Sequence, residues 1–294
     1  MNAQHLNAVP MNATAEVLGA SAESGGDVPP IKDGYLVFAD AEVEKVLKPF
    51  VSRDKIGITL EDAERVTDIE QRFRENKTIK SFNEMRYFSN LKSLRSYAFA
   101  SCSSLESIDT RNLESIGDYA FRYCEALKNI NAKNVVSFGY STFESCSSLE
   151  SIDTGNLESI GDYAFRYCEA LKHIDLNNVT TIPNYAFANC TALESMTLSK
   201  VETISASAFA YCSGLKVVDV SNLALIGNYG FNECTALEKF ICRSAVPPTI
   251  YTYSFYRVKN CLFYVPDASL EAYKVAENWS TYADRIKPIS EIEA

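Results

Sequence analysis

SIDTRNLESIGDYAFRYCEALKNI, at residues 107–130, returns 44 positions later as SIDTGNLESIGDYAFRYCEALKHI, at residues 151–174. The match extends over residues 101–130 and 145–174, which differ only where Arg111 becomes Gly155 and Asn129 becomes His173. Internal self-similarity at a fixed spacing is the sequence signature of repeat architectures. The duplication therefore predicts that this part of the chain is built from copies of one structural unit.

Each copy contains two shorter units, because a phenylalanine three residues before a cysteine recurs every 22 residues. These repeat phenylalanines are Phe99, Phe121, Phe143, Phe165, Phe187, Phe209 and Phe231. Their cysteines are Cys102, Cys124, Cys146, Cys168, Cys190, Cys212 and Cys234. A leucine follows each repeat phenylalanine by six residues and another apolar residue follows it by nine. This pattern is typical of a solenoid in which each unit forms one coil.

The apolar spacing within a unit predicts where its strand lies. Segments such as LKHIDL at residues 171–176 alternate in the manner of a β-strand, so successive coils should form a parallel β-sheet. The segment around each YAF should form a tight helical turn on the opposite side, with Phe and Cys pointing inward. The predicted fold class is an α/β solenoid whose cysteines form a ladder of small buried side chains rather than a redox or metal site.

Both ends of such an array need a cover for their apolar faces. Before the array, ADAEVEKVLKPF at residues 39–50 predicts a helix capped by Asp40, and a second helix should begin at Thr59 with a capping box. The apolar faces of these two helices are Val43, Val46, Leu47 and Phe50, and Ala63, Val66, Ile69 and Phe73. After the array, Phe255 gives a displaced eighth repeat phenylalanine. A terminal helix should cover the last coil with Leu270, Tyr273, Ala276 and Trp279.

The predicted organisation has four parts. Residues 1–30 form a flexible N-terminal arm, which is either a solvated tail or a peptide that orders against a partner. Residues 31–78 form a helical N-terminal cap, residues 79–243 the array of about seven 22-residue units, and residues 244–294 a strand-helix C-terminal cap.

The array resembles the BspA-like leucine-rich repeat family of bacterial surface proteins. The segment SFNEMRYFSNLKSLRSYAF at residues 81–99 is similar to the usual start of such arrays, and CLFYVPDASLEAYKVAENWSTYADRI at residues 261–286 is similar to their closing strand and helix. The resemblance implies a leucine-rich repeat fold, a location outside the cell or at its surface, and a non-catalytic scaffold for adhesion or binding. Related proteins often carry a calcium loop where this chain has SRDKIGITLED at residues 52–62, but Val51, Arg53 and Lys55 take its early positions, so calcium is not expected.

Composition excludes several other functions. The net charge of −10 with no basic run argues against nucleic acid, and no apolar stretch is long enough to span a membrane. No secretory signal is visible at the N-terminus. The chain has two histidines, His5 and His173, and no phosphate-binding glycine loop or zinc spacing, so we expect no enzyme activity, cofactor or metal.

Two rows of side chains set in register by the repeat are candidates for partner binding. The aspartate row stands ten residues after the repeat phenylalanines and contains Asp109, Asn131, Asp153, Asp175, Thr197 and Asp219. The tyrosine row contains Tyr123, Tyr167 and Tyr211, with Arg122 and Arg166 beside two of them. Each row has a structural alternative, a solvated strand face for the aspartates and packing on the convex side for the tyrosines.

These observations leave two functional classes. One is an adhesion or ligand-binding protein that presents the repeat surface to a protein or glycan partner. The other is a structural or receptor-binding component of a larger particle, such as a phage virion or secretion assembly, docked through residues 1–30.

Overall fold

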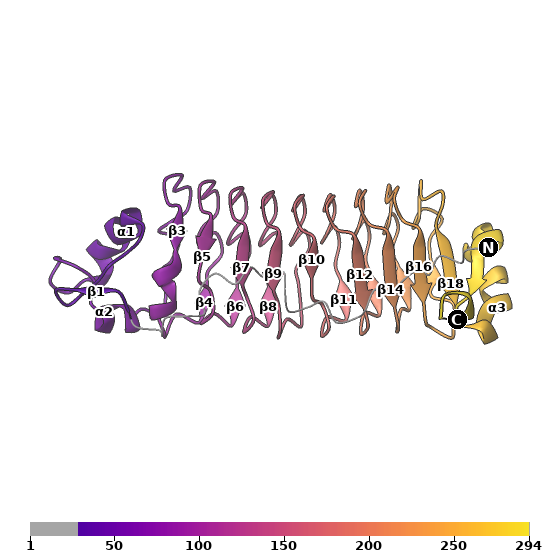
Figure 1. Cartoon of the computed structure of the whole chain (residues 1–294), viewed down its shortest axis with the longest axis horizontal. Helices are drawn as coiled ribbons and strands as arrows, with labels where there is room; N and C mark the ends of the chain where they lie inside the picture. The colour runs from indigo at the N-terminus through magenta and orange to yellow at the C-terminus, as the bar shows by residue number, and fades with distance from the viewer. Residues whose placement is uncertain (1–28, 294) are drawn as a thin grey trace, which may run out of the picture.

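The computed structural model describes residues 29–293, so the predicted N-terminal arm lies outside the described residues except for its last two. The coils follow one another in single file along the long axis of the molecule (Figure 1). Helices α1 and α2 lie at the N-terminal end of the stack and α3 lies at the other end.

The strands predicted nine residues after the repeat phenylalanines are present and parallel. They are β5 (Ser107–Ile108), β7 (Asn129–Asn131), β9 (Ser151–Asp153), β10 (His173–Ile174), β12 (Ser195–Leu198), β14 (Val217–Val220), β16 (Lys239–Cys242) and β18 (Leu262–Val265). Strands β3 (Ser81–Phe82) and β19 (Ile286–Pro288) extend this row at its two ends. From β5 to β10 and from β12 to β16, each paired residue lies 22 positions from its partner, as Ile130 does from Ile152. The row forms two five-stranded sheets that meet between β10 and β12. The parallel sheet predicted from the sequence is confirmed.

A second row of strands was not predicted from the sequence. It consists of β4 (Ser93–Leu94), β6 (Ser115–Ile116), β8 (Ser137–Phe138), β11 (Thr181–Ile182), β13 (Thr203–Ile204), β15 (Leu225–Ile226) and β17 (Thr249–Ile250). These strands are also parallel and form a three-stranded and a four-stranded sheet. Each is only two residues long, which is too short to show an alternating pattern.

The third side of each coil differs from the tight helical turn predicted around YAF. Residues two before and two after the repeat phenylalanine have a left-handed backbone, as at Tyr119 (φ 58°) and Tyr123 (φ 62°). The N–H of Phe121 donates to the carbonyl of Thr142 in the next coil at 2.9 Å, whereas a helix would keep its hydrogen bonds within one coil. The segment is tight as predicted but is not a helix. The N–H groups of Arg122 and Cys124 close turns within their own coil, and they alternate with N–H groups that bond to the next coil.

The repeat phenylalanines and cysteines form the predicted core ladder, and their side chains are fully buried. Consecutive rings from Phe73 through Phe255 stack with centroids 5.0 to 5.5 Å apart. Each cysteine thiol donates to the carbonyl oxygen of the phenylalanine one coil earlier, as Cys168 does to Phe143 at 3.2 Å. Phe255 stacks on Phe231 and confirms the predicted eighth position.

The N-terminal end contains a hairpin and two helices. Strands β1 (Ile31–Lys32) and β2 (Tyr35–Leu36) pair antiparallel, and α1 (Ala41–Val51) begins after its predicted N-cap, Asp40. Val43 and Leu47 are buried as predicted, but Phe50 is 61% exposed and lies under the guanidinium of Arg72. The hairpin was not predicted.

The second predicted helix is much shorter than its apolar pattern suggested. Helix α2 (Leu60–Glu64) has the predicted capping box between Thr59 and Asp62 but does not continue to Phe73. The Asp68 carboxylate accepts the N–H of Glu70, and this local hydrogen bond competes with a helix. Phe73 instead stacks on Phe99 at 5.0 Å and supplies the first ring of the core ladder.

The loop between α1 and α2 is held by protein hydrogen bonds to one carboxylate. Asp54 accepts from the Tyr35 hydroxyl at 2.6 Å and from the N–H of Ile56 at 2.8 Å. The hydrogen bond from Tyr35 is the main cause that lowers the pKa of Asp54 to about 2. The carboxylate is therefore already used as a hydrogen-bond acceptor by the loop itself.

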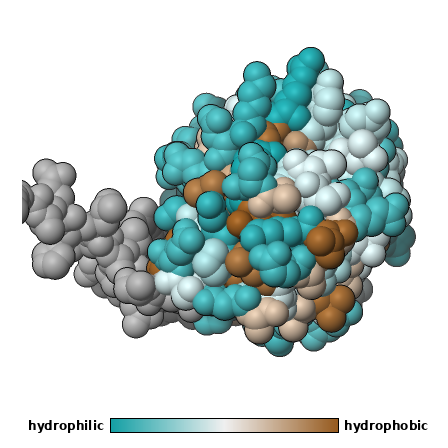
Figure 2. Space-filling view, turned by 90° about the vertical axis from the view of Figure 1, so that its right-hand side faces the viewer, coloured by the Kyte–Doolittle hydropathy of each residue, from teal (hydrophilic) through white to brown (hydrophobic). Residues whose placement is uncertain are grey.

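The C-terminal end is also broken into shorter pieces than predicted. The elements are 3₁₀ helix η2 (Asp267–Ser269), α3 (Leu270–Val275), 3₁₀ helix η3 (Trp279–Arg285) and α4 (Ser290–Glu293), and 3₁₀ helix η1 (Asn83–Tyr87) lies near the start of the array. A left-handed residue, Asn278, separates α3 from η3, so the single helix predicted through Trp279 was wrong. Tyr273 and Trp279 are nevertheless fully buried. Figure 2 looks onto this end, where hydrophobic residues are scattered among hydrophilic ones.

Candidate functional site

The first candidate surface, the strand face, carries the aspartate row along the first row of strands. At its start, the Asp109 carboxylate lies 3.0 Å from the guanidinium of Arg111 and 3.5 Å from that of Arg86. Toward its end, both carboxylate oxygens of Asp219 accept from Arg243 at 3.0 Å. These two aspartates are therefore neutralised within the protein.

Asp153 and Asp175 in the middle of the row differ from those two. Gly155 stands where the first copy has Arg111, and the Asp153 carboxylate has no ion pair or hydrogen bond among the described residues. The Asp175 carboxylate accepts only from Asn177 among the described residues, at 3.0 Å from its N–H and 2.8 Å from its side-chain amide. The two residues follow paired positions of β9 and β10, so their strands lie about 5 Å apart. This places two negative charges side by side without a cation.

A hollow on the strand face extends from Asp109 to Asp153. It has a volume of about 310 Å³, and among its lining residues are Asp109, Arg111, Asn129, Ser151 and Asp153. Both positions at which the duplicated segments differ, 111/155 and 129/173, lie along this face. His173 is exposed and pairs with Ser151 across β10 and β9. Within residues 29–293 no group of three or more His, Cys, Asp or Glu side chains is arranged to hold a metal ion.

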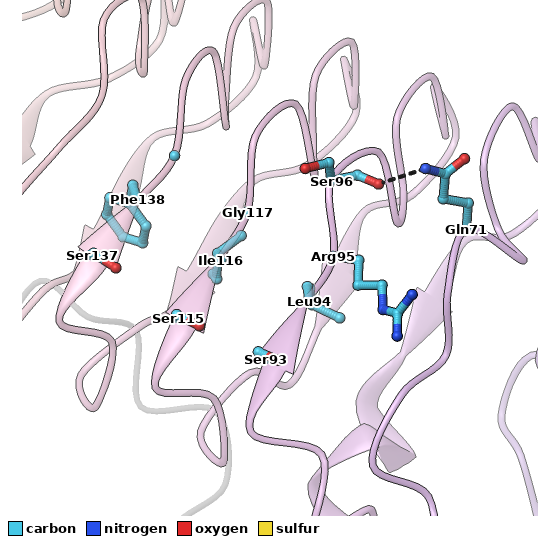
Figure 3. A pocket seen from close by; sticks show the side chains of 11 residues that line it. Gln71, Ser93, Leu94, Arg95, Ser96, Ser115, Ile116, Gly117, Ser137 and Phe138 are labelled. Carbon is cyan, nitrogen blue, oxygen red and sulfur yellow. Dashed lines mark hydrogen bonds between the residues drawn. The ribbon is translucent and has the colours of Figure 1, made fainter.

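A second concave surface lies over the short strands β4, β6 and β8 (Figure 3). This groove has a volume of about 530 Å³ and is lined by the hydroxyl groups of Ser93, Ser115 and Ser137. Its one charged lining residue, Arg95, pairs with Asp68 at 2.5 Å. The groove therefore offers hydrogen-bonding groups but no unneutralised charge.

The tyrosine row lies on the third side of the coils, where the backbone is left-handed. Arg122 donates to the Tyr123 hydroxyl at 2.9 Å, and Arg166 donates to the Tyr167 hydroxyl at 3.2 Å. The carboxylate of Glu144, which is 8% exposed, lies 2.8 Å from Arg122 and 3.6 Å from Arg166. The arginines beside the first two tyrosines are thus fixed by a shared, buried carboxylate.

Tyr211, the third member of the tyrosine row, has a different environment. Tyr211 is 50% exposed, and the residue before it is Ala210 rather than arginine. Tyr211 lines a cavity of about 510 Å³, which Tyr167 also lines. The sequence placed these two tyrosines in one row but did not indicate a cavity between them.

A further set of tyrosines on this side was missed in the sequence. We call this set the stacked tyrosines; its members stand at or next to the position two residues before the repeat phenylalanines and are Tyr97, Tyr119, Tyr140, Tyr163 and Tyr185, with Tyr229 and Tyr253 as a separate pair. Most neighbouring rings are nearly parallel, but the ring of Tyr140 is tilted by 56° and 49° to its two neighbours. Neighbouring ring centroids are 4.7 to 5.3 Å apart. The tyrosine that begins each YAF triplet is the sequence signal that could have revealed this set.

The ladder cysteines have an environment that suppresses thiol chemistry. Burial raises the pKa of several thiols well above the ordinary value, namely those of Cys124, Cys168, Cys190 and Cys234. Outside the ladder, burial raises the pKa of Cys261 to about 12. Because the thiolate is the nucleophile and metal ligand, these groups are inert at neutral pH.

Two rows of parallel strands joined by a buried phenylalanine–cysteine ladder define a leucine-rich repeat solenoid. The chain belongs to the family described as BspA type leucine rich repeat region, whose model matches residues 63–156 and 137–262 in six copies. No curated protein sequence matches the chain.

A solved structure shows the same fold. A leucine-rich repeat protein from Bacteroides ovatus is similar with a TM-score of 0.56 and 22% identity, over 67% of this chain and 57% of that chain. A leucine rich cell surface protein from Faecalibacterium prausnitzii is similar with a TM-score of 0.34 and 19% identity, over 69% of this chain and 78% of that one. This chain thus spans 57% of the length of the Bacteroides ovatus protein. None of the helices in residues 29–293 is long and apolar enough to cross a membrane.

Proposed function

We propose that the protein is a non-catalytic binding protein of the bacterial cell surface and that its strand face holds a protein partner through Asp153 and Asp175. This proposal depends on a difference in charge neutralisation among the members of the aspartate row. Asp109 and Asp219 are neutralised by arginines, whereas Asp153 and Asp175 have no cationic partner among the described residues. A pair of unneutralised like charges destabilises a sheet, so binding a cationic partner offsets that cost.

The architecture supports this role. Each coil hydrogen-bonds to the next on its strands and on its third side, so the row of aspartates is held in a fixed register before any partner arrives. A preorganised surface loses little conformational entropy on binding. Lysine and arginine side chains of a partner would find the two carboxylates on neighbouring strands.

Catalysis has little support in the described part of the chain. The ladder thiols are buried and donate to phenylalanine carbonyls, and His173 is exposed on a strand. A nucleophile needs a base within hydrogen-bond reach, and no such thiol–histidine pair occurs among residues 29–293. Membership of the BspA type family supports the assignment to the cell surface.

The proposal is tested by the binding of the full chain to immobilised collagen, laminin and fibronectin in biolayer interferometry. Replacing Asp153→Asn and Asp175→Asn together is expected to weaken binding at least tenfold, about 1.4 kcal/mol, because both charges that attract the partner are removed. The matched control is Glu158→Gln with Glu202→Gln, which makes the same charge change at exposed positions away from the aspartate row and should leave binding unaltered.

Binding that survives the aspartate substitutions would contradict the role assigned to the strand face. A wild-type chain that binds none of the three proteins would contradict the proposed function itself. Raising the salt concentration should weaken wild-type binding more than binding of the Asp153→Asn, Asp175→Asn variant, because salt screens exposed charges.

A further inference from the structure

The stacked tyrosines contain one gap that the chain leaves open. The position two residues before the repeat phenylalanine is serine in two coils, Ser141 and Ser207. At Ser141 the preceding residue, Tyr140, fills the place, with its ring 5.2 Å from Tyr119 and 5.3 Å from Tyr163. At Ser207 the preceding residue is Ala206, which has no ring to fill the gap.

The gap separates two ring faces by a defined distance. Tyr185 and Tyr229 stand on either side of Ser207, two coil steps apart, and one step between coils is about 5 Å. Their rings are therefore separated by about 10 Å, which leaves room for one six-membered ring between them.

The floor of the gap is hollow because its side chains are small. One residue after the repeat phenylalanines, the second to fourth coils carry Arg122, Glu144 and Arg166, whereas the fifth and sixth carry Ala188 and Ala210. The resulting cavity has a volume of about 510 Å³, within the range of small-molecule sites. We call it the tyrosine notch, and its main lining residues are Tyr167, Tyr185, Asn189, Tyr211, Tyr229 and Asn232.

The polar groups of the tyrosine notch indicate the chemistry of its ligand. Asn232 is 8% exposed, and its Oδ1 atom has no hydrogen-bond partner among the described residues. A buried acceptor without a partner is costly, so a ligand donor at this position is favoured. Asn189 and Ser207 add neutral hydrogen-bonding groups. The single charged residue in the lining, Arg166, already interacts with Glu144 and the Tyr167 hydroxyl.

We propose that the tyrosine notch binds one or two pyranose rings of a neutral glycan. The face of an aromatic ring is electron-rich, so it attracts the weakly positive C–H groups on the two faces of a pyranose, here between Tyr185 and Tyr229. The sugar hydroxyls can donate to Asn232 and exchange hydrogen bonds with Asn189 and Ser207. A single aromatic side chain from a protein would occupy only part of the volume and would leave most of these polar groups unpaired.

The test uses the full 294-residue chain and isothermal titration with neutral trisaccharides, namely maltotriose, cellotriose, chitotriose and mannotriose, and with sialyllactose as an acidic probe. At least one neutral probe should bind, and Ser207→Tyr should weaken it at least tenfold. The backbone at Ser207 has φ 55°, the same as at Tyr185, so the new ring should complete the stack without moving the chain.

Ser101→Tyr is the matched control. It adds a tyrosine in the first coil at φ 62°, the value found at Tyr123, and should leave saccharide binding unaltered. If Ser207→Tyr does not fold, Asn232→Ala and Tyr229→Ala report on the same cavity and should each weaken binding at least threefold.

Three results would overturn the inference: no binding of any neutral probe, unaltered binding by the variants of the tyrosine notch, or preference for sialyllactose. The Asp153→Asn, Asp175→Asn variant separates this site from the strand face, because it should lose protein binding and keep saccharide binding. If the expected binding is not found at one of the two sites, the other site can still be tested independently.

Discussion

At the residue scale, the repeated cysteine has a specific structural use. The repeat phenylalanine's carbonyl accepts the N–H of the cysteine in its own coil and also the thiol of the cysteine in the next coil, as Phe143 does from Cys146 and Cys168. A thiol is small enough for the core and still donates a weak hydrogen bond, which alanine cannot do. The spacing of the cysteines predicted their burial, but it did not reveal their acceptor.

This arrangement predicts how the thiols react. In the native protein at pH 8, a disulfide reagent such as dithionitrobenzoate should label the ladder thiols slowly, because burial hides them and raises their pKa. After unfolding in guanidinium chloride, all nine cysteines should react. Fast labelling of most ladder thiols in the native protein would contradict the buried ladder.

At the scale of elements, Asp40 joins helix α1 to the first strand of the array. One carboxylate oxygen accepts the N–H of Glu42 at 3.0 Å as an N-cap, and the other accepts the N–H groups of Lys80 at 2.5 Å and Ser81 at 3.2 Å. The carboxylate of one side chain thus accepts backbone N–H groups both at the start of α1 and at the edge of β3. The cap was predicted from the sequence, whereas the contact over 40 residues was not.

This carboxylate predicts a pH dependence of stability. Burial raises the pKa of Asp40, but the hydrogen bonds from Lys80, Glu42 and Ser81 outweigh that effect and lower it below its ordinary value. Its contribution is therefore present above the unfolded pKa of about 3.9 and is lost as pH falls through the lower folded value.

Asp40→Asn is the informative variant, because asparagine keeps an N-cap acceptor without the charge. The midpoint of guanidinium unfolding should fall at pH 7 by an amount that shrinks toward pH 3. Asp40→Ala should cost about 0.5–2 kcal/mol for the cap alone. A difference between wild type and Asp40→Asn that does not change with pH would contradict this account.

Several elements could not be predicted because the sequence rules depend on longer segments. The first strand row was predicted because a buried apolar residue recurs at the same position of every 22-residue unit. The strands of the second row are only two residues long, so they show no alternation of apolar and polar residues. The left-handed tyrosines were unexpected because non-glycine residues rarely adopt that backbone. In this protein the N–H groups of most left-handed tyrosines donate to carbonyls of the next coil, and the N–H of the residue after each of these tyrosines closes a turn within the same coil. These hydrogen bonds stabilise the left-handed conformation.

The charges of the candidate strand face could also be predicted only in part from the sequence. The period placed Asp109 and Asp219 in one row with Asp153 and Asp175. Asp109 is neutralised in part by the nearby Arg111, but the other partners, Arg86 and Arg243, lie 23 and 24 positions away in neighbouring coils. Such contacts depend on loop conformations that the repeat pattern does not specify. The substitution of Arg111 by Gly155 was visible in the sequence, but its effect on the charge of Asp153 required the structure.

Seven residues after the repeat phenylalanines, glutamate and lysine alternate from coil to coil, and some of them form ion pairs between neighbouring coils. Glu106 pairs with Lys128 at 3.0 Å, Glu150 with Lys172 at 2.8 Å, and Glu194 with Lys216 at 3.3 Å. All six side chains are at least half exposed, so each pair contributes little to stability. The coil order is held mainly by the buried ladder.

At the scale of the whole molecule, stability comes from contacts between neighbouring coils. The phenylalanine rings and the thiol–carbonyl hydrogen bonds connect each coil to the next one, and strand pairs add to these contacts within each sheet. In such a solenoid the free energy is approximately a sum over coils and their interfaces. An interior pair of coils should therefore be removable if the register is kept.

The duplication offers a natural deletion. Removing residues 111–154 joins Thr110 to Gly155 and recreates the junction that the chain already has at Thr154 and Gly155. The control removes residues 111–143, which joins Thr110 to Glu144 and breaks the 22-residue phase. Both variants keep the same N-terminal and C-terminal segments.

Thermal unfolding of these two variants, followed by circular dichroism, tests the stacking account most directly. The deletion of residues 111–154 should unfold in one cooperative transition, and its largest dimension in small-angle scattering should be about 10 Å shorter than that of the full chain. The deletion of residues 111–143 should lose the cooperative transition. An unfolded 111–154 variant, or a 111–143 variant as stable as the full chain, would contradict the claim that coils stack as interchangeable units in one register.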